Sequence, residues 1–172
     1  IVNMQTDASN VTLPGLFANK CFRIPNYQRG YAWGESQLND LWDDLMDIQK
    51  NGGSYRPHYT GAITLQQIDS STLTPAEKKL STSGMEYYNV VDGQQRLTTL
   101  VILLNTLAKF IKTGKKNLIE NYIKKEKVFK FSYGDTSGNS YRFFMKNIIG
   151  ESNTLPYTPT IYTANLDRAS LF

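Results

Sequence analysis

The stretch Val90-Val91-Asp92-Gly93-Gln94-Gln95-Arg96 separates two kinds of hydrophobic periodicity and so decides the fold class. The residues Tyr87–Val91 are aromatic or β-branched apart from one asparagine, which predicts a strand. From Leu97 onward, apolar residues cover nearly the whole circumference of a helix, which is typical of a buried helix. A glycine between strand and helix allows a tight turn and brings the first free N–H groups of the helix to the end of the sheet.

This predicted turn is suited to bind an anion. Unpaired amides and the helix dipole favour phosphate at a helix N-terminus, and Arg96, one turn into the helix, adds guanidinium donors. The alternative is structural: Asp92 caps the helix, and Gln95, three residues later, completes a capping box. The two readings are compatible, and the residues alone leave the choice open.

A second segment, Arg23–Trp33 (RIPNYQRGYAW), combines arginines with aromatic residues and is kept irregular by proline and glycine. Arginines interleaved with aromatic rings suit contacts with bases and phosphates. Alternatively, Tyr27 and Trp33 pack in the core while the arginines pair with an acidic helix.

The other predicted elements are short strands and helices in alternation. The predicted strands are Cys21–Ile24, Tyr59–Ile68, Tyr87–Val91 and Val128–Tyr133. Four helices are predicted. The first is an acidic amphipathic helix over 36–48 that ends at Asn51–Gly53, and the second is a buried helix from Gly93 to Thr113 with Gly114 as its C-cap. An exposed lysine-rich helix and a last short helix over Tyr141–Ile149 follow. The rest predicts a short helix or irregular arm over 1–20, a polar surface loop over Asp69–Gly84 and a turn over Gly134–Gly138. This mixture predicts an α+β fold.

Composition favours one soluble globular domain. The chain has 172 residues, 40% of them hydrophobic and 20% charged, which is enough for one core. We expect a single domain over 1–172, with a core of about 21–150 and a tail, or the start of a missing C-terminal region, over 151–172. No apolar run approaches the length of a membrane span, and Ile1–Met4 lacks the features of a signal peptide.

The cysteine content bears on the cellular compartment, and the charge distribution bears on the kind of partner. Cys21 stands alone, so it forms no internal disulfide and no thiolate zinc site by itself, and a reducing, cytoplasmic compartment is expected. The formal net charge is +4, and the segment from Lys109 to Lys130 alone holds eight lysines and two glutamates. Such a segment fits either a nucleic-acid backbone or a solvated helix face.

Two separate motifs resemble those of a known family. The segments IPNYQRGYAW (24–33), LNDLWDDL (38–45), HYTGAITL (58–65) and YNVVDGQQRLTTLVILL (88–104) occur in this order. They are similar to the N-terminal domain of the GmrS/GmrD-type modification-dependent restriction proteins. The resemblance extends from Phe22 to about Leu104, and the chain from Lys109 onward matches only loosely.

The resemblance implies a ParB/sulfiredoxin-like fold, in which a small mixed sheet packs against several helices. It also implies nucleoside-triphosphate binding and hydrolysis that control a separate DNA-cutting domain. Carried over to this chain, the phosphate turn consists of Asp92, Gly93, Gln94, Gln95 and Arg96, and the facing wall of the pocket consists of Tyr27, Gln28 and Arg29.

The implied catalytic residues lie within this turn: Asp92, Gln94, Gln95 and Arg96. Arg96 and Arg29 would neutralise phosphate charge, and Gln94 or Gln95 would orient the attacking water. Mg²⁺ is the expected metal, with Asp92 as its nearest carboxylate and Asp43 or Asp44 as further ligands if the acidic helix faces the pocket. A Gly-x-x-x-x-Gly-Lys-Ser/Thr stretch is missing from the sequence, so the P-loop class is excluded.

The resemblance also implies a partner. The nuclease part of such proteins resembles an HNH-type domain, which needs more than one histidine, whereas this sequence holds only His58, expected to be structural or exposed. We therefore expect a regulatory module of a phage-defence restriction system, with the nuclease in a partner subunit or in the rest of a longer protein, DNA contacted through the full-length protein, and no membrane partner. The alternatives are a ParB-like DNA-binding module without nucleotide turnover and a purely structural interaction domain.

Overall fold

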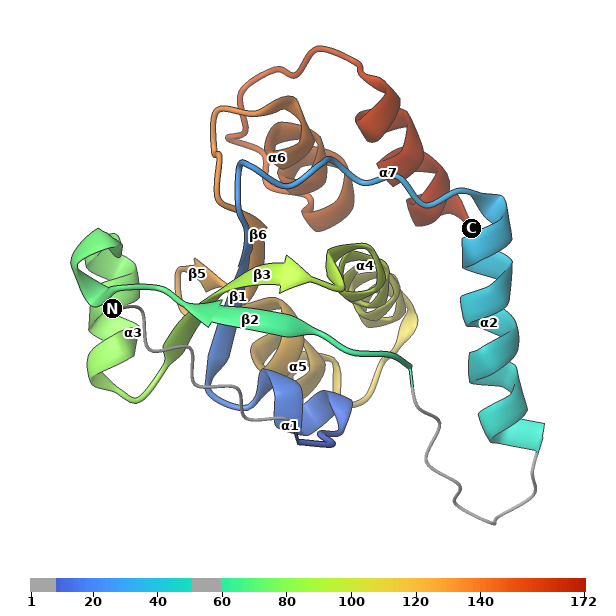
Figure 1. Cartoon of the computed structure of the whole chain (residues 1–172), viewed down its shortest axis with the longest axis horizontal. Coiled ribbons are helices and arrows are strands. Elements are labelled where there is room, and N and C mark those ends of the chain that lie inside the picture. The colour runs from blue at the N-terminus through green and yellow to red at the C-terminus, as the bar shows by residue number, and fades with distance from the viewer. Residues whose placement is uncertain (1–8, 51–59) are drawn as a thin grey trace.

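Four strands form one mixed sheet in the computed structural model, which describes residues 9–50 and 60–172 (Figure 1). The strand order is β2-β3-β1-β6. The strands β3 (Glu86–Asp92), β1 (Lys20–Ile24) and β6 (Phe131–Tyr133) are parallel, and β2 (Thr64–Gln67) is antiparallel to β3. A small mixed sheet flanked by helices confirms the predicted α+β class.

The parallel strands end side by side. Arg23 pairs with Asn89 and Ile24 pairs with Tyr133, so the connections after β1, β3 and β6 leave the sheet on one side. We call this side the carboxyl edge; it comprises the loop 25–34, the turn Asp92–Gly93 and the loop 134–138. The opposite side, where Asn19, Met85 and Lys130 precede these strands, is the amino edge. In Figure 1, α1 and α5 lie below the strands, whereas the loop 25–34 crosses above them.

Alternation along the strands divides the core between the two faces of the sheet. Phe22, Ile24 and Val90 belong to the larger hydrophobic cluster, which is completed by the buried helix α4 and by the C-terminal helices. Cys21 and Tyr87 point to the opposite face, where they join a smaller cluster with residues around α3. Both faces are therefore covered, as is typical of a sheet built mainly from parallel strands.

Seven α-helices occur in the described ranges: α1 (Leu13–Phe17), α2 (Glu35–Lys50), α3 (Pro75–Thr82), α4 (Gln94–Phe110), α5 (Lys115–Leu118), α6 (Asn139–Phe143) and α7 (Ile161–Leu171). The minor elements are a 3₁₀ turn over Ser70–Thr72, π-helical segments over Ile119–Ile123 and Phe144–Ile149, and the strands β4 (Lys124–Lys125) and β5 (Val128–Phe129). None of the helices in this part of the chain is long and apolar enough to cross a membrane.

Several predicted boundaries are wrong for local reasons. The strand predicted over Tyr59–Ile68 is regular only from Thr64 to Gln67, and Tyr59 lies outside the described residues. The strand predicted over Val128–Tyr133 is two strands, because the backbone of Lys130 donates to Ile123 in one direction and accepts from Phe22 in the other. The predicted end of the acidic helix, Asn51–Gly53, also lies outside the described residues.

The glycine predicted to end α4 instead starts the next helix. The helix α4 ends at Phe110, because Ile111 is extended, with ψ 141°. Gly114, in the left-handed conformation at φ 78°, is the N-cap of α5. The lysine-rich segment that follows is exposed as predicted, but it is a short helix and a π-helical turn rather than one continuous helix.

The predicted polar loop over Asp69–Gly84 is wrong, because it contains the helix α3. Thr74 and Glu77 form a capping box around the N-terminus of α3, and Pro75 occupies its first turn. Leu80 is 2% exposed and attaches the helix to the smaller core cluster. The sequence Thr-Pro-Ala-Glu contains this signal, which the low aliphatic content of the segment hides.

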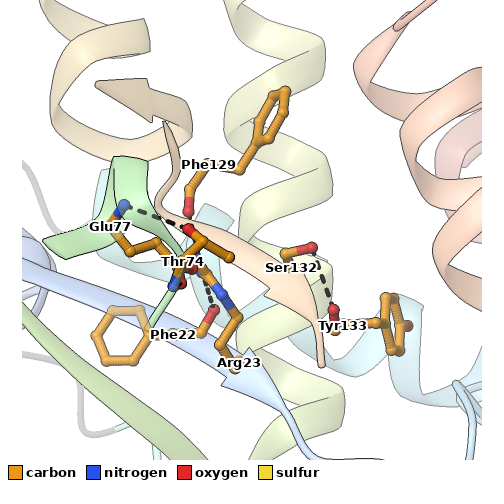
Figure 2. Close-up of polar contacts among 7 residues, drawn as sticks. All are labelled: Phe22, Arg23, Thr74, Glu77, Phe129, Ser132 and Tyr133. Carbon is orange, nitrogen blue, oxygen red and sulfur yellow. Dashed lines mark hydrogen bonds and ion pairs between the residues drawn. The ribbon is translucent and has the colours of Figure 1, made fainter. Parts of the chain in front are cut away.

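A part-buried ion pair fixes α3 to β1 (Figure 2). The Arg23 Nη2 atom lies 2.6 Å from Glu77 Oε1, and the two side chains are 13% and 16% exposed. Arg23 Nη1 also donates to the carbonyl oxygens of Phe22 and Phe129, at 2.9 and 3.0 Å. Because Glu77 Oε2 accepts from the Thr74 N–H at 2.9 Å, one carboxylate both caps the helix and anchors it.

The predicted C-terminal tail is also wrong over Ile161–Leu171, which is the helix α7. Thr160 and Thr163 form its capping box, and Leu166 is fully buried in the larger core cluster. The helix packs against α2, α4 and α6. Threonine in place of glutamate at the third helical position makes the sequence signal weaker than that of α3.

Candidate functional site

The helix α4 begins directly after a left-handed glycine at the carboxyl edge. Gly93 has φ 82° and is the N-cap, and a Cβ atom there would lie 2.8 Å from the carbonyl oxygen of Ala62. Both the backbone conformation and the close approach require glycine. The predicted sequence of strand, turn and helix is confirmed.

The predicted capping box is wrong. The Asp92 Oδ1 atom accepts a hydrogen bond from the N–H of Gly93, at 2.9 Å, and gives no side-chain cap to α4. Gln95 turns away from the helix terminus, and its Oε1 accepts from the N–H of Ala32 at 2.8 Å. The physical reason is that the loop 25–34 competes successfully for the glutamine amide.

The first amides of α4 remain available as donors. The first hydrogen bond within the helix runs from the Leu97 N–H to the Gly93 carbonyl, at 3.1 Å. Within the described ranges no acceptor lies on the backbone N–H groups of Gln94, Gln95 or Arg96. A helix terminus with free amides and the positive end of the helix dipole attracts anions.

Two glutamines tie the loop 25–34 to this terminus. Gln94 Nε2 donates to the Arg29 carbonyl oxygen, at 3.0 Å, and to Gln28 Oε1, at 3.4 Å. Gln95 Nε2 donates to the Gly30 carbonyl oxygen, at 3.2 Å. In return, Gln28 Nε2 donates to the Val91 carbonyl oxygen at 2.7 Å. The structure therefore brings the predicted wall residues Gln28 and Arg29 next to the predicted turn.

A buried pair of hydroxyl groups also joins the loop 25–34 to α4. The Tyr31 and Thr99 hydroxyl oxygens are 2.7 Å apart, and Thr99 Oγ1 also donates to the Gln95 carbonyl oxygen, at 2.8 Å. Because the single threonine proton is used in the second bond, Tyr31 donates the first. Burial raises the pKa of Tyr31, which keeps this donor protonated.

The guanidinium of Arg96 lies between an aromatic ring and a glycine. Its Cζ atom is 5.8 Å from the centroid of the Trp33 ring, a cation–π contact. On the other side, a Cβ atom on Gly61, whose φ is 108°, would collide with the same guanidinium. Among the described residues the ion pairs include neither Arg96 nor Arg29, so both cations remain available to an anionic ligand.

The helix α7 supports the loop 25–34 from its other side. Asn165 Nδ2 donates to the Tyr31 carbonyl oxygen at 3.1 Å. The Tyr162 side chain lies so close to Gly30 that a Cβ atom there would collide with its ring. These supporting residues were missed because α7 was predicted as a tail, and Gly61 was missed although a glycine inside a strand pattern signals close approach.

Of the other predicted residues, Asp92 belongs to the turn itself, and the rest lie outside the contacts between α4 and the loop 25–34 described above. Tyr27 is 66% exposed on the loop 25–34. Asp43 and Asp44 lie on α2, and His58 lies outside the described residues. Asp92 is exposed, with one carboxylate oxygen on Gly93. In the described part of the chain no group of three or more histidine, cysteine or acidic side chains has the arrangement of a metal site.

Comparison with known proteins identifies the family. No curated protein matches the chain. The family model for the GmrSD restriction endonuclease, N-terminal domain, matches residues 13–169, nearly the whole chain. The match includes α7, which lies beyond the part of the chain that carries the resemblance in the sequence. The chain therefore belongs to the family of GmrSD restriction endonuclease N-terminal domains.

Proposed function

We propose that this domain binds a nucleoside triphosphate at the N-terminus of α4 and hydrolyses it to regulate a nuclease in a modification-dependent, phage-defence restriction system. The nuclease is an HNH-type domain or subunit, and DNA is contacted through the full-length protein. Family membership supports the restriction system. The proposal of a nucleotide ligand is supported by the geometry of the site at the carboxyl edge.

The observation that carries the proposal is the group of free amides at this edge. The N–H groups of Gln94, Gln95 and Arg96 have no described acceptor, and the Arg96 guanidinium follows within the same turn. Ligands of parallel sheets bind outside the carboxyl ends of the strands, where this terminus lies. Arg29 is exposed on the adjoining loop and adds a second cation.

The donor set also fits a magnesium ion. Mg²⁺ prefers carboxylate oxygen, phosphate and water, and binds through one or two carboxylates rather than a full protein cage. Asp92 offers an exposed carboxylate with one oxygen used by Gly93. Asp92 would hold the ion, and the triphosphate with Mg²⁺ would supply the phosphoanhydride bond and neutralise the charge that develops on its cleavage.

The two glutamines have different roles in this proposal. Gln95 uses both ends of its amide on the loop 25–34, through Gly30 and Ala32, and is a positioning residue. Gln94 uses its nitrogen on the same loop, whereas its Oε1 accepts no hydrogen bond from the described residues. Gln94 is therefore the better candidate to orient the attacking water.

The same contacts provide a route to the nuclease. The loop 25–34 is held by α4 through Gln94 and Gln95, and by α7 through Asn165. Any shift of the loop on nucleotide binding moves a group that contacts both helices. We propose that α7 transmits the nucleotide state to the nuclease module.

Thermal unfolding with ATP, GTP, CTP and UTP, each with and without Mg²⁺, tests the proposal. A ligand at roughly 100 times its Kd stabilises the folded state by about 2.7 kcal/mol, which raises the Tm of a domain of this size by about 5 to 10 °C. We expect such a rise for at least one nucleotide in the parent protein and in Lys78→Gln, an exposed charge-matched control on α3.

The same rise should vanish in Arg96→Gln, and phosphate release should be assayed only for the nucleotide that raises the Tm. A folded parent that responds to none of the four nucleotides rules the proposal out for this domain. A rise that persists in Arg96→Gln places the nucleotide elsewhere on the protein.

A DNA-binding module without turnover is the second candidate. A hollow of about 880 Å³ in the lysine-rich segment is lined by four lysines and two glutamates, an excess of positive charge that supports contact with a phosphate backbone: Lys112, Lys115, Lys116, Lys124, Glu120 and Glu126. This function predicts DNA affinity that falls steeply with salt and is unaffected by nucleotides. A fluorescence-anisotropy titration over several salt concentrations, with and without nucleotide, distinguishes the two candidates.

A further inference from the structure

We propose that a hollow at the amino edge is a binding site for a small organic anion, with the anionic group on Lys130 and Lys125 and an apolar body against Pro14 and Tyr122. The hollow lies between the end of α1, the π-helical turn Ile119–Ile123 and the strand β4. It is at the opposite side of the sheet from the N-terminus of α4, so it is independent of the proposed nucleotide site.

The hollow has the size and lining of a small-molecule site. Its volume is about 540 Å³, within the range of about 300 to 1,000 Å³ that such sites occupy. Pro14 is exposed and Tyr122 is half-buried, so these two residues supply the apolar surface of the hollow, and the buried side chains of Phe17 and Met85 lie behind it. Asn19 and Asn121 add amide groups that could orient a polar substituent.

The buried lysine is the main argument for an anion. Lys130 lines the hollow, is 4% exposed, and donates from Nζ to the Phe17 carbonyl oxygen at 2.5 Å. This is the one hydrogen bond that the Lys130 ammonium group makes to the described residues, although such a group carries three donors. Burial lowers the pKa of Lys130, and the nearby ammonium groups of Lys125 and Lys20 lower it as well. An anion between these cations would relieve both effects.

The acidic residues of the hollow already have lysine partners. Glu120 pairs with Lys116 at 3.8 Å and Glu126 pairs with Lys79 at 3.5 Å. Lys79 and Lys116 are not part of the lining, so both glutamates are paired with lysines from outside it. In contrast, Lys125 and Lys130 belong to none of the ion pairs between described residues. The charge that remains for a ligand is positive.

The backbone around the hollow is also unusual. Asn19 and Glu126 both have φ 53°, and they are the two residues other than glycine with positive φ in the described ranges. Both line this hollow. Asparagine adopts left-handed backbone readily, whereas glutamate does so at a cost, so the conformation of Glu126 is the one that the surrounding structure must hold.

Phenyl phosphate is a suitable probe because it combines a phosphate group with an apolar ring. Inorganic phosphate lacks the ring and benzyl alcohol lacks the charge, so the three compounds separate the two parts of the proposal. We expect saturable binding of phenyl phosphate, with a Tm rise of about 3 to 5 °C at roughly ten times its Kd. We expect weaker binding of inorganic phosphate and no binding of benzyl alcohol.

Substitutions then locate the site. Lys130→Met should abolish the rise, and Lys125→Gln should weaken the binding of phenyl phosphate at least several-fold. Lys127→Gln, an exposed lysine outside the lining, and Arg96→Gln, at the other edge, should bind as the parent does. Since Lys130→Met also removes the bond to Phe17 and could unfold the protein, Lys125→Gln supplies the test on a folded variant.

Backbone amide shifts in two-dimensional NMR provide a second readout. Shifts confined to the residues around Asn121 and Lys125 support the proposal. No saturable effect of phenyl phosphate on the folded parent overturns it. Unchanged affinity for phenyl phosphate in Lys125→Gln also overturns it. Shifts confined to the start of α4 overturn it as well, and would mean that the anion binds at the proposed nucleotide site.

Discussion

The two edges of the sheet are built with different chemistry. At the carboxyl edge, neutral glutamine amides and glycines hold the backbone, as in the bonds of Gln94 and Gln95 to the loop 25–34. At the amino edge, Lys130 is buried against a carbonyl oxygen, and on the face of the sheet that α3 covers Arg23 and Glu77 form a part-buried ion pair. Neutral hydrogen bonds depend on shape, whereas buried charges depend on pH and on neighbouring charges.

This difference indicates how each edge can be used. Because its tethers are neutral, the carboxyl edge leaves the positive groups Arg29 and Arg96 uncompensated by described ion pairs. On the face of the sheet that α3 covers, the Arg23 guanidinium is bonded within the fold, to Glu77 and to two carbonyl oxygens. Arg23 therefore contributes to stability, whereas Arg29 and Arg96 belong to none of the ion pairs between described residues.

The largest effect is expected from Gly93→Ala at the carboxyl edge. The new Cβ atom meets both a φ of 82° and the Ala62 carbonyl oxygen, 2.8 Å away. We expect a loss of about 3 kcal/mol in the free energy of unfolding, measured by denaturant titration.

Gly84→Ala is the matched control, since Gly84 has φ 92° and no atom within 4 Å of the added group. Backbone strain alone should cost about 1 kcal/mol there. Equal losses in the two variants would contradict the close approach of Ala62 to the turn.

A smaller effect is expected from Glu77→Gln on the face of the sheet that α3 covers. The change removes the charge of a side chain that is 16% exposed and leaves the Arg23 guanidinium without its partner. We expect a loss of about 2 kcal/mol at neutral pH, again from denaturant titration. Glu86→Gln, an exposed glutamate of β3, is the control and should change stability by less than about 0.5 kcal/mol.

The loss in Glu77→Gln should depend on pH in one direction. Burial raises the pKa of Glu77, but the Thr74 N–H and the Arg23 guanidinium lower it by more, so its net pKa lies below the ordinary glutamate value of 4.5. The ionised carboxylate therefore contributes stability above about pH 4.5, and this contribution is lost as the pH falls through the lower, folded-state pKa. Parent and variant should converge in stability in acid, and a difference that is constant with pH would contradict the ion pair.

Gln95→Ala tests the neutral tether and should have a still smaller effect. It leaves the Ala32 N–H and the Gly30 carbonyl without their partners, for a loss of about 1 kcal/mol. This loss should not change between pH 4 and pH 8, because no ionisable group is removed. Gln66→Ala on the exposed strand β2 is the control. A strong pH dependence in Gln95→Ala would mean that the loop 25–34 is held by charges after all.

The strongest local signals in the sequence predicted the site, but not what holds it together. The change of period at Asp92–Gly93 located the turn, since a strand pattern and a buried-helix pattern meet there. The bonds of Gln94 and Gln95 to the loop 25–34 join residues 63 to 66 positions apart, and residue types alone do not specify such partners. The proposed capping box would have bonded Gln95 to the neighbouring Asp92, whereas in the structure Gln95 bonds to the distant residues Gly30 and Ala32.

The two helices that the sequence did not predict, α3 and α7, lie in segments with a high content of polar residues. The helix α3 buries Leu80 alone among its own residues, and α7 buries Thr163, Leu166 and Ala169, so neither shows a broad apolar stripe. Their stability comes from caps and from tertiary contacts such as the Arg23–Glu77 pair, which become visible only with the fold. The nucleotide, the metal and the nuclease partner remain predictions of the family resemblance and of the site geometry.

The smallest effect on stability is expected from the exposed lysines beside the amino edge. Lys116 and Glu120 pair at 3.8 Å with side chains that are 85% and 53% exposed, so Lys116→Gln should change stability by less than about 0.5 kcal/mol. The Lys124–Glu151 pair, at 2.9 Å with 35% and 41% exposure, should contribute more, and a double-mutant cycle in denaturant measures both. If Lys116→Gln is as costly as Lys124→Gln, the exposed lysine segment has a structural role. If Lys116→Gln leaves stability unchanged, the variant removes a charge without affecting folding. Any loss of DNA affinity in this variant is then due to the lysine surface itself.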